Sequence, residues 1–117
     1  MAEITKQAGI SSLSEIKDNP NYKRFIDGFG LDLSKSFSSL NVKYKEIFTD
    51  EERVDIFKIE KKDGKPFGQI EFHGLLGVKI RVEEGKNLAN LEDTVERIIK
   101  KRKEKMKKNG LIPDIRR

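Results

Sequence analysis

The spacing of apolar residues changes along this chain and divides it into three parts. The apolar positions of the first part recur at intervals of three and four, and they are Tyr22, Phe25, Ile26 and Phe29. This interval is that of one face of an α-helix, so we predict a helix that ends at Gly28 and Gly30. A further half-turn is expected to bring more apolar residues to the same core, namely Leu33, Phe37 and Leu40. Residues 11–16 are predicted to form a short helix at most, before Pro20.

From Asn41 the period becomes two, which is typical of strands with one buried face. Four such runs follow one another, and they are VKYKEIF, RVDIFKIE, FGQIEFH and LLGVKIRV. Asp63-Gly64, between the second and third runs, indicates a tight hairpin turn with a positive φ at the glycine. In RVDIFKIE the apolar residues fall on both faces, which requires a bulge or burial on both sides. We therefore predict four antiparallel strands in sequence order.

The third part is a helix predicted at about residues 90–109. Asn90 is expected to cap its start. The apolar stripe of this helix consists of Leu91, Val95 and Ile98 or Ile99. Arg102 interrupts the stripe where a buried residue would be expected. Gly110 suits the left-handed position that follows a helix, and Pro113 prevents the helix from resuming.

These elements together predict a two-layer α+β domain with an N-terminal helical segment, a four-stranded antiparallel meander and a C-terminal helix. Residues 11–117 are expected to form this single domain, and residues 1–10, which lack a strong period, a flexible arm. The helices should cover one face of the sheet. The other face is expected to carry the polar side chains of Lys43, Lys45, Lys58, Gln69, Glu71, His73, Lys79 and Arg81.

Charge is unevenly distributed along the chain, whose net charge is +5. Residues 96–117 hold ten Lys and Arg against three acids, a net +7, whereas residues 1–95 hold fifteen against seventeen, a net −2. An asymmetry of this kind suggests binding to nucleic acid or another anionic surface. There are no cysteines, which excludes disulfides and thiolate chemistry, and no run of about 20 apolar residues. We expect a soluble cytoplasmic protein without membrane contact.

Few residues could carry catalytic or metal chemistry. His73 is the only histidine, and we expect a surface position at a strand end, within hydrogen-bond reach of Glu71 but without a third metal ligand. The acids Asp50, Glu51, Glu52 and Asp55 are interpreted as a solvated turn. No glycine-rich segment matches a phosphate loop or a dinucleotide motif. The sequence therefore predicts a protein that is not an enzyme and has no cofactor.

The basic C-terminal segment is the candidate site. Its residues are Arg97, Lys100, Lys101, Lys103, Lys105, Lys107, Lys108, Arg116 and Arg117. Successive helix steps of about 100° spread the helical cations around nearly the whole circumference, so we predict that the last two turns project beyond the sheet into solvent. No aromatic residues lie among these cations, which favours binding of DNA or RNA largely without sequence preference.

Two other interpretations compete with nucleic-acid binding. Cations late in a helix suit the negative pole of its dipole and keep a protein soluble, but two or three of the eight between Arg97 and Lys108 would be enough. Alternatively, the chain is a protein-binding module, that is, an adaptor, inhibitor or assembly factor that acts on an acidic partner. Such a module could also act as a homo-oligomer, because a helix with a short stripe is stabilised by packing against a copy of itself.

Overall fold

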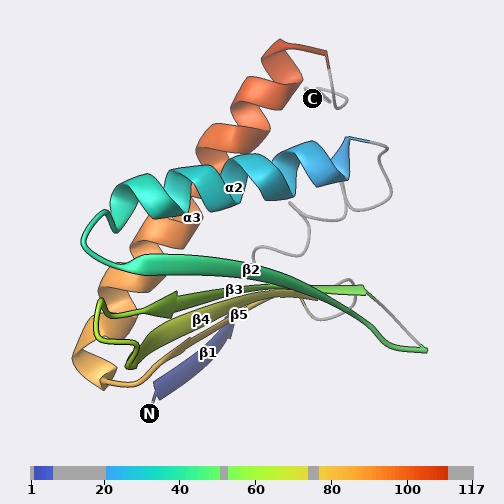
Figure 1. Ribbon diagram of the computed structural model, residues 1–117. Coiled ribbons are helices and arrows are strands. Elements are labelled where there is room, and N and C mark those ends of the chain that lie inside the picture. The colour runs from blue at the N-terminus through green and yellow to red at the C-terminus, as the bar shows by residue number, and fades with distance from the viewer. Residues whose placement is uncertain (1, 7–20, 51–52, 74–76, 111–117) are drawn as a thin grey trace.

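The computed structural model of the 117-residue chain describes residues 2–6, 21–50, 53–73 and 77–110 (Figure 1). The elements in chain order are β1 (Ala2–Lys6), α2 (Tyr22–Ser36), β2 (Asn41–Phe48), β3 (Arg53–Glu60), β4 (Pro66–His73), β5 (Gly77–Val82), the 3-10 helix η1 (Gly85–Asn87) and α3 (Leu88–Lys108). The predicted α+β class is confirmed. The short helix predicted at residues 11–16 lies outside the described residues.

The strands form one antiparallel sheet in the order β1-β5-β4-β3-β2. The predicted meander of four strands in sequence order is confirmed as β2 to β5. β1 was not predicted, because residues 1–10 were expected to be an arm; residues 2–6 instead pair with β5, with Ile4 opposite Ile80. A five-residue segment is too short to show a clear period, and the edge of β5 supplies its backbone hydrogen-bond partners.

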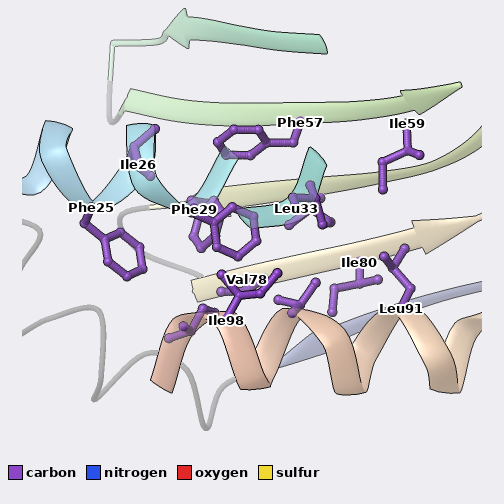
Figure 2. Packing of buried hydrophobic residues seen from close by; sticks show 14 of the residues in the cluster. Phe25, Ile26, Phe29, Leu33, Phe57, Ile59, Val78, Ile80, Leu91 and Ile98 are labelled. Carbon is purple, nitrogen blue, oxygen red and sulfur yellow. The ribbon is translucent and has the colours of Figure 1, made fainter. Parts of the chain in front are cut away.

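Both helices lie on the same face of the sheet (Figure 1). Between the two layers, α2 contributes Phe25, Phe29 and Leu33 to the core, and α3 contributes Leu91 and Ile98 (Figure 2). Val95 of α3 belongs to the same core. The rings of Phe29 and Phe72 meet edge to face with centroids 4.8 Å apart. The helices therefore occupy fixed positions relative to each other through a shared aromatic and aliphatic core.

α2 continues through Gly28 and Gly30 to Ser36, so the predicted end of the helix at these glycines was wrong. A Cβ added at Gly30 would lie 2.8 Å from the Phe57 ring, and one added at Gly28 would lie 2.8 Å from the Arg102 guanidinium. Each glycine lowers helix propensity by about 1 kcal/mol relative to alanine. Because the two glycines have no side chain, β3 and α3 can approach the α2 backbone closely.

The sheet confirms several local predictions. Gly64 has a φ of +87° in the turn between β3 and β4. In β3, Val54 and Ile56 are buried on one face and Phe57 and Ile59 on the other, so burial is two-sided. The register aligns Lys43 with Lys58, Lys58 with Gln69, Gln69 with Arg81, and Glu71 with Lys79. The polar side chains predicted for the face opposite the helices therefore do share one face.

α3 begins earlier than predicted. Its N-cap is Asn87, at the end of η1, whereas Asn90 lies inside the helix and its carbonyl accepts a hydrogen bond from the Thr94 hydroxyl at 2.9 Å. The predicted cap at Asn90 was therefore wrong by one helical turn. At the other end, Gly110 has a φ of +73°, which confirms the left-handed position after the helix.

Candidate nucleic-acid interface

The candidate interface is built where α2 and α3 cross. At the crossing, Arg102 donates two hydrogen bonds to the carboxylate of Asp32, from Nε to Oδ2 at 2.6 Å and from Nη2 to Oδ1 at 2.8 Å. Only 18% of the Arg102 side chain and 10% of the Asp32 side chain are exposed. The guanidinium lies directly over Gly28, where a larger residue would displace it. This pair explains why a cation interrupts the apolar stripe of α3.

The charge of Asp32 is stabilised in this position. The hydrogen bonds from Arg102 lower the pKa of Asp32 below its ordinary value of 3.8, against the effect of burial, and the charges of Arg102, Lys101 and Lys35 lower it further. The carboxylate and the guanidinium are therefore both ionised at neutral pH. Arg102, which the sequence analysis did not include among the site residues, acts as an internal cation rather than a surface cation.

The end of α3 is not surrounded by solvent as predicted. Its second half does extend past the sheet, and α2 crosses α3 where that half begins (Figure 1). Met106 belongs to the hydrophobic core and is 5% exposed. Because Arg102 and Met106 lie four residues apart, they continue the stripe begun by Ile98 and Ile99. One side of the last two turns is therefore packed, and only the remaining sides can meet a ligand.

The predicted site residues separate into three groups. Five are exposed: Arg97, Lys100, Lys101, Lys105 and Lys108. Lys103 and Lys107 are half-buried, and Arg116 and Arg117 lie outside the described residues. At about 100° per residue, Lys100 and Lys108 project from the side of α3 away from Arg102 and Met106, whereas Arg97 and Lys101 lie on the flank that faces α2. Glu104 is the only acid between Arg97 and Lys108.

A groove between the two helices contains Lys35, a cation that was not predicted as a site residue. It has a volume of about 320 Å³ and is lined by Asp32, Lys35, Ser36, Arg97, Ile98 and Lys101. Lys35 is in the last turn of α2. It lies near two of the predicted site residues only because the helix continues past Gly28 and Gly30. No local signal in the sequence around Lys35 indicates this position.

The open face of the sheet, opposite the helices, also carries cations, but acids lie among them. Lys43 forms an ion pair with Glu60 at 3.1 Å. Along β4, Glu71 accepts a hydrogen bond from Gln69 at 2.6 Å and lies 2.8 Å from Nε2 of His73, as the sequence analysis predicted. His73 is largely buried, so its predicted position at the surface was wrong. Among the described residues, no three His, Cys, Asp or Glu side chains are placed to hold a metal ion.

A polar network around one buried carboxylate, at one end of the sheet, was not predicted from the sequence. Asp55, expected in a solvated turn, is buried and accepts hydrogen bonds from the Tyr44 hydroxyl at 2.5 Å and from Arg53 Nη2 at 3.0 Å. Burial, followed by the hydrogen bond to Asp55, raises the pKa of Tyr44 to about 12. Burial also raises the pKa of Tyr22, in the first turn of α2, and the charge of Asp55 raises it further. The network links the start of α2 to the sheet.

Comparison of the chain with protein-family models, with curated proteins and with solved structures finds no match. Within the described ranges, no helix has the length and apolar character needed to cross a bilayer. What the site does is therefore inferred from its residues alone.

Proposed function

We propose that this protein binds nucleic acid, largely without sequence preference, through the exposed cations of α3. The observation that supports this function is the group of five exposed Lys and Arg residues between Arg97 and Lys108, with Glu104 as the only acid among them. Complementing the helix dipole requires only two or three such residues. The surplus favours an anionic ligand, and the arrangement offers charge rather than base-specific contacts.

The expected binding mechanism is the neutralisation of backbone phosphates and release of their counterions. Each phosphate contact contributes about 0.9 to the slope of log K against log salt for duplex DNA and about 0.7 for a single strand. Five contacts would give a slope of about −3.5 to −4.5, so affinity should fall by about 10²–10³ between 50 and 200 mM salt. α3 contains no aromatic side chain on which bases could stack, which agrees with low sequence preference.

A matched pair of triple variants tests this proposal. Lys100, Lys105 and Lys108 are replaced by Glu in one variant. In the other, Glu replaces Lys43, Lys45 and Lys58, which are also exposed, on β2 and β3. Both variants change the net charge by the same amount. In fluorescence anisotropy with single-stranded and duplex oligonucleotides at low salt, we expect the α3 variant to lose about 100-fold or more in affinity and the sheet variant less than about fivefold.

Equal losses in the two variants would assign the binding to overall charge and contradict a site on α3. Wild-type protein that does not bind either oligonucleotide at low salt would contradict the function itself. Truncation after Ile99 is a poor alternative, because it removes Arg102 and Met106 and so opens the packing between the helices. Charge reversal at exposed positions leaves that packing intact.

A second candidate function, protein binding, is favoured by the exposed side chains of β2. This strand lies at the edge of the sheet, and Tyr44, Ile47 and Phe48 are 40%, 37% and 69% exposed. An extended segment of a partner can add to such an edge through backbone hydrogen bonds, and Lys43 and Lys45 would favour acidic side chains in that segment.

Selection from a random peptide library tests this second candidate. We expect enrichment of segments that alternate acidic and apolar residues, and loss of their binding in the Phe48→Ser variant. Whether the chain binds a copy of itself, as a homo-oligomer, is tested separately by sedimentation analysis at increasing protein concentration. Enriched peptides that bind Phe48→Ser equally well would contradict a site on β2.

A further inference from the structure

We infer that the groove between α2 and α3 binds a backbone phosphate of the nucleic acid directly, with Lys35, Arg97 and Lys101 as its ligands. This inference rests on the proposed function and extends it, because it assigns a defined phosphate position and gives α2 a part in binding. The binding surface then consists of two helices rather than one.

The two helices bring three cations to one place. Arg97 and Lys101 lie one turn apart on α3, about 6 Å along its axis, and both line the groove. Lys35 faces them from α2, and Ser36 adds a hydroxyl that can donate a further hydrogen bond. Ile98 contributes an apolar surface to the lining. Charged donors from separate elements that converge on one small volume are suited to a compact anion such as phosphate.

The one acid that lines the groove does not cancel this charge. Both oxygens of Asp32 accept hydrogen bonds from Arg102, so the carboxylate is already matched by an internal cation. Within the described part of the chain, no ion pair engages Lys35, Arg97 or Lys101. The groove therefore keeps an excess of three positive charges, next to a neutral pair.

The end of the α2 dipole opposes this excess in part. The carbonyl pole of a helix is equivalent to about half a negative charge, and Lys35 lies in the last turn of α2. The simplest alternative role of Lys35 is to complement that pole. This alternative predicts an effect on helix stability and none on ligand affinity, so Lys35 is the residue that separates the two explanations.

The size of the groove limits what can enter it. A volume of about 320 Å³ is at the lower end of the range for small-molecule sites and would accommodate a phosphate with its sugar. The bases would remain outside the groove, so the residues that line it would not contact them. Such a contact positions the backbone without selecting a sequence.

Lys35→Ala is the decisive variant, and Lys23→Ala is its matched control. Both lysines are exposed on α2, but Lys23 lies in the first turn, at the other end of the helix. We expect Lys35→Ala to weaken oligonucleotide binding about tenfold at 50 mM salt and to reduce the slope of log K against log salt by about 0.7–0.9. Lys23→Ala should change affinity by less than about twofold, and Lys35→Arg should retain the slope.

The outcomes separate this inference from the proposed function. If Lys35→Ala behaves like Lys23→Ala while the α3 triple variant loses binding, the groove contact is wrong and the α3 function stands. If neither the α3 triple variant nor Lys35→Ala weakens binding, both fail. Circular dichroism of each variant confirms that the helices are intact, so that an affinity change reports on contact.

Discussion

Beyond Ile99, α3 has an inner side against α2 and an outer side in solvent, and both sides carry cations. On the inner side, Arg102 is matched by the carboxylate of Asp32, which lies 70 positions earlier in the chain. On the outer side, Lys100 and Lys108 are exposed. The residue types are similar, but an acid opposite the cation makes one side structural, and the scarcity of acids makes the other side available to a ligand.

The same difference separates α3 from the open face of the sheet. That face also has several lysines, yet Glu60 pairs with Lys43, and Glu71 lies opposite Lys79 in the register. A count of cations alone would treat the two surfaces as equivalent. The distribution of acids distinguishes them, because attraction of a polyanion depends on the net charge of the surface it meets.

The largest effect is expected at the inner cation. Arg102→Ala leaves a mostly buried carboxylate without its partner, so we expect it to lower the free energy of unfolding by about 2–3 kcal/mol. In a chain of this size that corresponds to a fall in Tm of about 10 °C. Lys100→Ala, on the outer side of the same helix, should change stability by less than about 0.5 kcal/mol. Urea and thermal unfolding, followed by circular dichroism, measure the stability of both variants. Equal losses of stability would contradict the distinction between the inner and outer sides of α3.

A smaller effect is expected at the glycine beneath Arg102. A side chain at Gly28 would overlap the guanidinium, so Gly28→Leu should cost about 1–2 kcal/mol despite the higher helix propensity of leucine. Ser34→Leu, at an exposed position of α2, is the control and should change stability by less than about 0.5 kcal/mol.

The double variant sharpens this test. Removal of the guanidinium leaves room for the new leucine, so Gly28→Leu combined with Arg102→Ala should cost less than the sum of the two single changes. Additive costs in the same unfolding experiments would show that Gly28 and Arg102 are not in contact.

The smallest effect is the pH dependence of the inner pair. Because the pKa of Asp32 is lowered in the folded state, its contribution to stability is fully present above the ordinary value of 3.8 and is lost as the pH falls through the lowered value. Asp32→Asn should therefore be less stable than wild type between pH 5 and 7, and the difference in Tm should shrink as the pH approaches 2. A difference that stays constant over this range would show that the charge of Asp32 is not what stabilises the crossing.

Local sequence patterns determined much of this fold. Alternation of apolar residues placed β2 to β5 and assigned their polar side chains to one face, and the need for positive φ identified the turn at Gly64 and the end of α3 at Gly110. The basic segment was also evident, because charge clustered in sequence stays clustered on a helix. Period, turn chemistry and charge each depend on residues within a few positions of one another, so they can be read from the chain alone.

Tertiary structure decided which of those residues are internal and which can meet a ligand. Gly28 and Gly30 were interpreted as helix ends because their lack of a Cβ favours turns, but here it allows Arg102 and Phe57 to approach α2. Arg102 became an internal cation, and Lys35 joined the groove, through contacts between segments about 60 to 70 residues apart. Burial of Asp55 likewise required Tyr44 from the neighbouring strand. The physical reason is that the partner of a charge is set by packing between distant segments, and no local period records that packing.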